Sequence, residues 1–290
     1  MTDVFRLISK RAIRAIGAVL SIALLIGTVT GCQPATEAES NNNADAKTVI
    51  VGVNTKTTGV FNFVNENGEI DGYEYQILKK IDDKYPEYKF EYKQLDLPNT
   101  LASLDSGKID LASSSLQLND ERKQKYGYTD QGTSSYVVRI TVAENNDTVK
   151  TIRNLAGKSF MAMNGDPTAA LIEQYNAKYP ARKINIKYGD WTLEQLVSGL
   201  MNGAADAEAF SESSIARHNK ANPTAKWKAV GEPLLQQNTR FFLNKNDTEL
   251  KTKMDEAIKE LRDSGELRKL SEQYLDGDFS EPVEEKTIVF

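Results

Sequence analysis

The chain has 290 residues, of which 36 are Lys or Arg and 41 are Asp or Glu, so its formal net charge at pH 7 is −5. Without residues 1–31 the count becomes 32 basic against 40 acidic residues, a net charge of −8. An acidic body lacks the positive surface that binds nucleic acid or an anionic membrane, so neither partner is expected.

Residues 1–31 have the features of a targeting segment. Four basic residues precede a mostly apolar run from Ala15 to Val29, and Val29-Thr-Gly-Cys32 resembles a lipobox. A simple transmembrane anchor is the alternative, but the run is short for a span of about 20 residues. Because Cys32 is the chain's only cysteine, no internal disulfide can form. We expect Cys32 to be lipidated and to hold the protein on the extracytoplasmic side of the membrane.

Residues 32–46 contain no large apolar side chain, so we expect a flexible tether. The folded part is then predicted to begin near Lys47. About 230 residues follow, which is more than one typical core needs and normal for two lobes.

The elements expected first alternate between strands and helices. In chain order they are a strand at 48–53, a hairpin around Asn67-Gly68, a helix from Tyr75 that ends before Pro86, a strand at 90–95, a helix at 100–106 capped by Asn99, and a strand at 109–112.

The stretch from Gly107 to Arg122 combines a strand with hydroxyl and basic side chains. The expected strand is followed by three serines, and Arg122 comes seven residues after Ser115. Hydroxyl donors and a guanidinium fork could therefore converge on one carboxylate. The alternative is a surface loop with a solvated basic face.

This pattern occurs twice, since residues 101–110 return in similar form at 196–206. In both copies a helix ends at Gly, an Asp follows three residues later, and a Ser follows that Asp by five, at Ser115 and Ser211. Two similar α/β lobes are implied. Ligands in open α/β sheets lie beyond the carboxyl ends of the strands, so the two serines should face one cleft.

The elements expected in the second half repeat the alternation. They are a strand at 137–142 that leaves the first lobe, a second sheet that starts at 155–163, a helix at 168–176, a helix with a capping box at Thr192, the strand of Asp206, a return through 231–243, and two helices at 250–264 and 266–274.

The run Leu-x-Ser-Gly-Lys-Ile-Asp-Leu followed by Asp-Glu-Arg-Lys resembles the signature of bacterial extracytoplasmic solute-binding proteins for amino acids, in a lipoprotein form. The likeness extends from about Thr48 to Phe279. It includes Gly68-Glu-Ile-Asp-Gly72-Tyr-Glu, Leu155-Ala-Gly-Lys158, Asn202-Gly-Ala-Ala-Asp206 and Asp263-Ser-Gly-Glu-Leu267.

The resemblance implies a type 2 periplasmic-binding-protein-like fold, in which two α/β lobes are joined by a hinge of two strands. The expected boundaries are 47–138 and 236–280 for lobe 1 and 139–235 for lobe 2. The implied function is capture of a small carboxylate-bearing solute, most simply an amino acid or a derivative, for delivery to ABC permease subunits. A monomer without cofactor or metal is expected.

The resemblance also implies that Arg122 is a bidentate partner for a ligand carboxylate, assisted by Ser115 and Gln117. Four aromatic residues are candidates for the cleft, with core packing as the alternative. They are Phe61, Phe63, Tyr128 and Tyr136.

The second lobe departs from the family's pattern at two positions. The family usually has Asp where this chain has Ser211, and Gly-Thr where it has Gly165-Asp166. We expect Asp166 to bind a cationic group, with Ser211, Glu208 and Glu212 as further candidates. The ligand would then lack a standard α-amino acid head group or would bind in an altered pose. The alternative is a local slip of the alignment and ordinary amino acid binding.

Two other functions stay open. The only histidine, His218, lies among polar residues, and no metal spacing or glycine-rich phosphate loop is present. An acid/base lyase that uses Asp166, Glu208 or Glu212 is one alternative. A sensor or partner-binding lipoprotein that does not take part in transport is the other, because one fold serves many roles.

Overall fold

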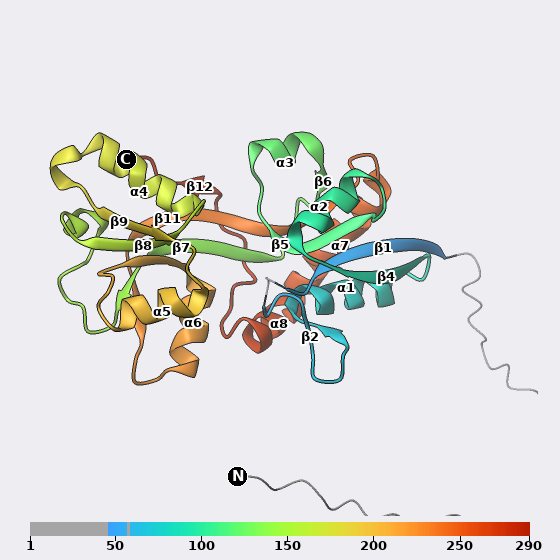
Figure 1. Ribbon diagram of the computed structural model, residues 1–290. Helices are drawn as coiled ribbons and strands as arrows, with labels where there is room; N and C mark the ends of the chain where they lie inside the picture. The colour runs from blue at the N-terminus through green and yellow to red at the C-terminus, as the bar shows by residue number, and fades with distance from the viewer. Residues whose placement is uncertain (1–45, 57–58) are drawn as a thin grey trace, which may run out of the picture. The chain divides into compact units, whose positions relative to one another are not determined.

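The computed structural model describes residues 46–290 apart from 57–58, and it is a mixed α/β structure with two lobes (Figure 1). The targeting segment, Cys32 and nearly all of the expected tether lie outside the described residues. Within the part of the chain that is described, no helix is long and apolar enough to cross a bilayer.

Lobe 1 is built on three parallel strands, in the order β4-β1-β5, and β11 (Trp227–Leu243) extends this sheet in the antiparallel sense. Its elements before the crossover are β1 (Lys47–Asn54), β2 (Phe63–Val64), β3 (Ile70–Asp71), α1 (Tyr73–Lys84), β4 (Tyr88–Leu95), α2 (Leu97–Asp105), β5 (Leu111–Leu116), α3 (Asp120–Lys125) and β6 (Gly127–Tyr128).

Lobe 2 pairs β8 with β9 in parallel and β10 with β7 in the antiparallel sense. Its elements are η1 (Ile152–Leu155), β8 (Ser159–Met163), α4 (Pro167–Lys178), η2 (Pro180–Arg182), β9 (Asn185–Gly189), α5 (Leu193–Met201), β10 (Glu208–Ser211) and α6 (Glu212–Ala221).

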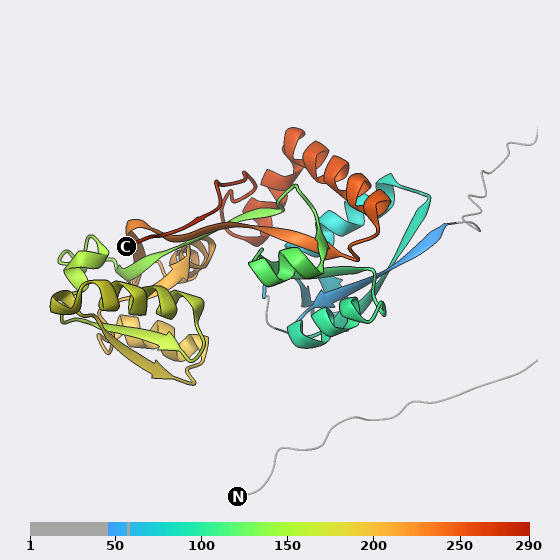
Figure 2. The same ribbon diagram turned by 90° about the horizontal axis from the view of Figure 1, so that it is seen from above.

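Two long strands connect the lobes, β7 (Ser134–Ala143) and β11 (Trp227–Leu243). They pair in the antiparallel sense and run side by side from one lobe into the other (Figures 1 and 2). The pairing register shifts between Val230 and Leu235. The two-strand connection expected from the sequence is therefore present. Strand β11 returns the chain to lobe 1, where α7 (Thr248–Asp263) and α8 (Glu266–Tyr274) follow.

Each lobe has its own apolar core. In lobe 1, alternate residues of β1 (Val49, Val51 and Val53) are fully buried against α1, α7 and α8, while a second cluster lies beneath α2. In lobe 2, one cluster packs around α4 and another around α5 and α6. In lobe 1 the sheet thus has a helical layer on each of its faces.

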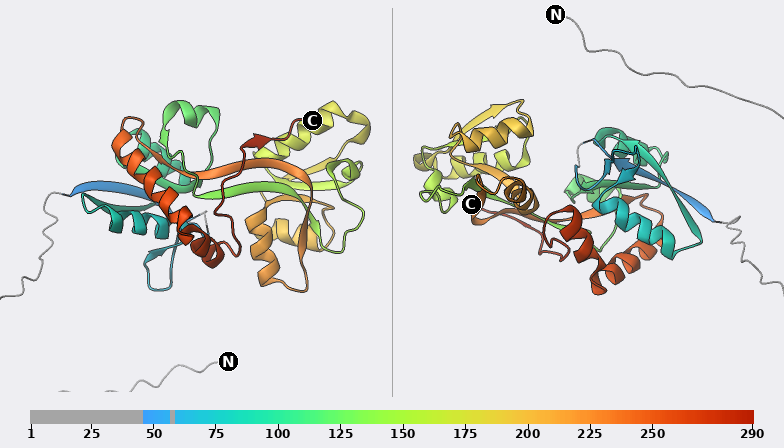
Figure 3. Two further views of the ribbon diagram at one scale, coloured as in Figure 1. Left: turned by 180° about the vertical axis from the view of Figure 1, so that it is seen from behind. Right: turned by 90° about the horizontal axis from the view of Figure 1, so that it is seen from below.

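The last ten residues, which the expected boundaries left outside both lobes, run along β11 into lobe 2 (Figure 3). Strand β12 (Lys286–Thr287) pairs with Leu235 and Gln236, and the ring of Phe290 lies 5.2 Å from that of Tyr175. This tail is a third segment that connects the lobes.

Two local predictions differ from the structure. The strand expected at 109–112 is β5, which continues through the three serines to Leu116, because β1 and β11 both pair with it. The cap of α2 is Asp96 rather than Asn99; its carboxylate accepts a hydrogen bond from the Asn99 backbone N–H at 2.9 Å. A proline in the first turn suits this earlier start, since its missing N–H needs no partner there.

The sequence repeat has a structural counterpart. Gly107 and Gly203 both have positive φ, at 67° and 77°. Asp110 accepts a hydrogen bond from the Ile50 backbone N–H of β1, and Asp206 accepts one from the Ser159 backbone N–H of β8, both at 2.8 Å. In each lobe the carboxylate ties the loop after a helix to the first strand of the sheet.

Candidate functional site

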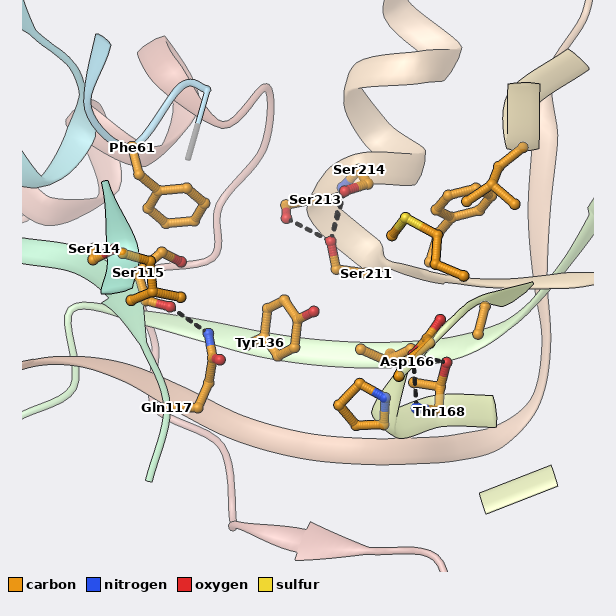
Figure 4. Close-up of a pocket in the computed structure, with 18 of the residues that line it drawn as sticks. Phe61, Ser114, Ser115, Gln117, Tyr136, Asp166, Thr168, Ser211, Ser213 and Ser214 are labelled. Atoms are coloured by element: carbon orange, nitrogen blue, oxygen red, sulfur yellow. Dashed lines mark hydrogen bonds between the residues drawn. The ribbon is translucent and has the colours of Figure 1, made fainter. Parts of the chain in front are cut away.

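A cavity of about 650 Å³ is lined by both lobes and by β7 (Figure 4). This volume is within the range of 300–1,000 Å³ that is common for small-molecule sites. The residues that line it are mostly small, polar or aromatic: Asn54, Phe61, Leu97, Ser114, Ser115, Gln117, Tyr136, Val138, Met163, Asn164, Gly165, Asp166, Pro167, Thr168, Leu196, Ala209, Phe210, Ser211, Ser213, Ser214 and Arg217.

The lobe 1 wall is supported by the carboxylate of Glu74, which is fully buried. One of its oxygens accepts hydrogen bonds from the Ser113 hydroxyl at 2.7 Å, the Ser115 backbone N–H at 3.1 Å and the Asn62 amide at 3.3 Å. Burial raises the pKa of Glu74 to about 7, while these donors favour its ionised form and lower the pKa. The network therefore fixes the end of β5 from behind.

Ser115 has a left-handed backbone, with φ at 48°, which is uncommon for a residue other than glycine. Its N–H donates to Glu74 and its carbonyl accepts the Gln117 side-chain amide at 2.6 Å. Beside it, the Ser114 hydroxyl accepts from the Asn54 amide at 2.9 Å. Such strained conformations persist where the surrounding contacts over-determine them, as they do at this wall.

Arg122 does not line the cavity. It lies on α3, where its guanidinium donates to the Gln117 carbonyl oxygen at 2.8 Å and sits 6.0 Å from the centre of the Phe242 ring. No carboxylate in the described ranges is within ion-pair distance of it, and burial lowers its pKa. The structure thus places a half-buried, unneutralised cation directly behind a cavity-lining residue.

The four candidate aromatics divide into two pairs. Phe61 and Tyr136 both line the cavity, Phe61 beside Ser114 and Ser115 and Tyr136 between Gln117 and Asp166 (Figure 4). Burial and the negative charge of Asp166 raise the pKa of Tyr136. Phe63 and Tyr128 instead contact other rings, those of Tyr274 and Phe242, and do not line it. For Phe63 and Tyr128 the structure agrees with the alternative, packing against other rings outside the cavity.

In lobe 2, Asp166 lines the cavity at the beginning of α4 and serves as the helix cap. Its Oδ1 accepts hydrogen bonds from the Thr168 backbone N–H at 2.8 Å and the Thr168 hydroxyl at 2.7 Å. These two hydrogen bonds fix the carboxylate of Asp166 at the cavity wall (Figure 4). They use only Oδ1, so Oδ2 remains for another partner.

The beginning of α6 gives the cavity a second polar edge. Ser211 is the cap; its hydroxyl accepts from the Ser214 backbone N–H at 3.2 Å and shares hydrogen bonds with the Ser213 and Ser214 hydroxyls. As expected from the repeat, Ser115 and Ser211 line one cavity from different lobes. One turn further along α6, Arg217 also lines it.

Two predicted acidic site residues lie elsewhere. Glu208 faces the core beneath α5, only 1% exposed, and neither of its carboxylate oxygens has a partner among the described residues. Burial raises its pKa to about 8. Glu212 accepts a hydrogen bond from the Arg139 Nε at 2.6 Å. Neither lines the cavity, in contrast to the expectation: Glu208 points inward from its strand, and Glu212 is paired with Arg139.

Two charged residues at or behind the cavity wall were not predicted as site residues from the sequence. Glu74 was noted only as part of a family motif, because nothing in the sequence shows that its carboxylate is buried behind Ser115. Arg217 is one of the polar residues around His218, and no sequence pattern singles it out. Within the described residues, no cluster of His, Cys, Asp and Glu is arranged to hold a metal.

Comparison with known proteins places this geometry in a family context. Residues 49–277 match the model for bacterial extracellular solute-binding proteins, family 3. The L-cystine-binding protein TcyJ of Bacillus subtilis is 34% identical over 269 residues, which is 92% of this chain and 96% of the relative. The L-cystine-binding protein TcyK of the same organism is 28% identical over 256 residues, covering 88% and 94%.

Solved structures agree with the fold. The probable amino-acid ABC transporter extracellular-binding protein ytmK from Bacillus subtilis has a TM-score of 0.71 at 28% identity and covers 79% of this chain and 98% of its own. The L-cystine solute receptor of Neisseria gonorrhoeae, at 22% identity, shares the fold with a TM-score of 0.67 over 82% and 96%. The predicted fold class, a two-lobe α/β structure of the type 2 periplasmic-binding kind, is confirmed.

Proposed function

Because the chain belongs to family 3 of the bacterial extracellular solute-binding proteins, we propose that it captures an amino acid outside the cytoplasm and delivers it to an ABC permease. L-cystine is the first candidate solute, since TcyJ and TcyK, named as L-cystine-binding proteins, match 92% and 88% of this chain. In this proposal the protein binds and releases its solute without chemical change.

The observation that carries the proposal is the composition of a cavity that both lobes line. Serine hydroxyls project into it from the end of β5 and from the beginning of α6. Hydroxyls and helix N-termini both favour a carboxylate over a neutral apolar group. Phe61 and Tyr136 supply apolar contact area for the rest of the solute.

Arg122 is proposed as the partner of the α-carboxylate. Its NH1 group donates to the carbonyl oxygen of Gln117, which lines the cavity, and its remaining N–H groups are the donors that this proposal assigns to the ligand. A carboxylate would neutralise a cation that has no acidic partner among the residues described and would bind it in a bidentate manner.

Asp166 is proposed as the partner of an ammonium group. Among the described residues that line the cavity it is the one acidic side chain, and its Oδ1 is held in place by Thr168. Ser211 stands where relatives of this kind usually have Asp, so the negative charge would be supplied from α4 instead of from the end of β10. Attraction to the charged head group then comes from both lobes.

Closure of the lobes is proposed to accompany binding. The paired strands β7 and β11 connect the lobes, and Val230 and Leu235 mark an irregularity in their pairing. Ligand can shift this equilibrium only through contacts that are better in the closed state, and residues on both walls offer such contacts.

We also propose that lipidated Cys32 anchors the protein to the extracytoplasmic face of the membrane. The support is the order of basic, apolar and Gly-Cys segments at the N-terminus. Mass spectrometry of the mature N-terminus tests this: an acylated Cys32 is expected, and an unmodified first residue would contradict it.

Binding itself is tested with the full-length protein purified in detergent. A thermal-shift screen over amino acids, small peptides, sugars and metals comes first, because a ligand that binds only the native state raises the melting temperature. Titration calorimetry of the compounds that score then gives affinities. L-cystine is expected to stabilise the protein. Stabilisation by sugars alone, or by nothing in the screen, would contradict the proposal, and product formation would indicate the lyase alternative.

A further inference from the structure

Arg217 is a cationic side chain in the cavity that has no assigned role. It extends from α6 and lines the cavity together with Ser213 and Ser214 of the same helix. Across the described ranges, its guanidinium has no hydrogen-bond acceptor and no carboxylate within 4.0 Å. A cation in a cavity wall without a partner is a binding group for an anion.

The acidic residues nearest in sequence or in the cavity do not neutralise Arg217. The carboxylate of Glu212, on the same helix, pairs with Arg139 at 2.6 Å. Asp166 lines the same cavity but forms no ion pair with Arg217; its Oδ1 caps α4. Opposite charges therefore stand in one cavity and remain separate, so each is available to a different group of one ligand.

The position of Arg217 sets a requirement on the ligand's length. It lies four residues beyond Ser213, which is about 6 Å further along the axis of α6. Gln117 and Ser115, by contrast, belong to the lobe 1 wall in front of Arg122. A ligand that touches both ends must have two anionic groups at opposite ends of its chain.

We propose that Arg217 binds a second carboxylate, distinct from the one assigned to Arg122, so that the site selects amino acids with two well-separated carboxylates. Disulfide-linked cystine has this form, and a single short amino acid does not. The inference rests on the proposed function, because it assumes that this cavity binds an amino acid. It extends that function by assigning the residue that distinguishes long dicarboxylates from other amino acids.

A purely structural role for Arg217 predicts a different outcome. A cation in the second half of a helix is favoured by the helix dipole, and its methylene groups can cover apolar surface. If Arg217 acted only through the helix dipole or by covering apolar surface, its loss would lower the stability of the protein but would leave the preference between two ligands unchanged. Selectivity between two ligands is thus the measurement that separates the roles.

The test compares two disulfides by titration calorimetry at pH 6, where thiolate-driven exchange is slow. One probe is L-cystine and the other is the mixed disulfide of cysteine and cysteamine, which lacks only the second carboxylate. The proteins are wild type, Arg217→Gln and Arg153→Gln. Arg153 is an exposed cation of lobe 2 that does not line this cavity, so its variant controls for the change in net charge.

We expect wild type and Arg153→Gln to bind L-cystine at least about tenfold more tightly than the mixed disulfide. Arg217→Gln should bind the two probes equally, with its affinity for the mixed disulfide unchanged and its melting curve intact. If Arg217→Gln keeps the wild-type preference, or if wild type shows none, the inference is overturned while the proposed function stands. If wild type binds neither probe nor any other amino acid, the proposed function fails as well.

Discussion

The two walls of the cavity differ in how they hold their acidic side chains. Behind the lobe 1 wall, Glu74 is fully buried, and three donors bind one of its oxygens. Behind the lobe 2 wall, Glu208 is equally buried and has no donor within the described part of the chain. At the lobe 2 surface, Asp166 and Arg217 face the cavity as charged groups.

The comparison indicates that the two walls of the cavity have different roles in binding. Lobe 1 presents a preorganised surface, because the Glu74 network holds Ser115 in a conformation that the backbone would otherwise avoid. Lobe 2 presents charges whose partners must come from the solute. We infer that lobe 1 binds the group that all solutes of this protein share, and that lobe 2 distinguishes one solute from another.

Arg122→Ala is expected to have the largest effect and tests the general role of lobe 1. Loss of the guanidinium should cost roughly 2–5 kcal/mol of binding free energy for every amino acid that binds, because the ligand carboxylate would lose its charged partner. Titration calorimetry measures this. Lys123→Ala, an exposed cation on the same helix, is the matched control and should change affinity little. Normal affinity in Arg122→Ala would remove this residue from the site.

Glu208→Gln tests the buried lobe 2 carboxyl group that has no hydrogen-bond donor among the described residues. The measurement is the pH dependence of the free energy of unfolding. Burial raises the pKa of Glu208 from 4.5 in the unfolded chain to about 8 in the native state. Between these values the native protein binds the additional proton, so its free energy of unfolding should fall as pH rises, by at most about 1.4 kcal/mol per pH unit. The Gln variant has no such proton and should lose this slope.

Glu74→Gln is the matched control for that experiment. Burial raises the pKa of Glu74 only to about 7, so its contribution to the slope should level off near that pH. The upper end of the pH range therefore reports more on Glu208 than on Glu74. Denaturant unfolding at several pH values measures both variants. A wild-type slope that persists above pH 7 in Glu208→Gln would show that the two walls do not differ in this way.

The regular elements were the part of the molecule that local sequence patterns could predict. The helix expected at 266–274 is α8, and the capping box at Thr192 begins α5. Both rest on interactions between residues only a few positions apart. The repeat of Gly and Asp was equally informative, because Asp110 and Asp206 each fix a loop to a neighbouring strand in the same way.

The site could be predicted only in part, because its charges depend on contacts between distant segments. Glu74 and Ser115 are 41 positions apart, and only the fold shows that one supports the other. Glu208 has the sequence context of a site residue, yet the alternation of β10 turns it into the core. The C-terminal tail had no periodic pattern, since its register is fixed by pairing with β11.

Asp166→Asn sharpens the role assigned to the lobe 2 charges. Asn also caps helices well, so the stability of the protein should change by less than about 0.5 kcal/mol, whereas Ala at this position should cost about 1 kcal/mol. Affinity for a solute with an ammonium group should fall about tenfold in both variants. Calorimetry combined with thermal unfolding separates the two effects. Equal affinity of Asp166→Asn and wild type for an ammonium-bearing solute would show that this charge does not contact the solute.

Lys220→Gln is expected to have the smallest effect and asks whether the two walls act independently. Lys220 of α6 pairs with Asp276, which follows α8, so this ion pair connects lobe 2 with lobe 1. The Lys220 side chain is 69% exposed, and such pairs contribute no more than about 1 kcal/mol. We therefore expect solute affinity to change by less than about fivefold, and the change should shrink at high salt because exposed charges are screened. Titrations at two salt concentrations measure this. A larger loss of solute affinity that does not depend on salt would mean that this ion pair controls closure of the lobes. The effects of Asp166 and Arg217 on affinity would then depend on the contact with lobe 1.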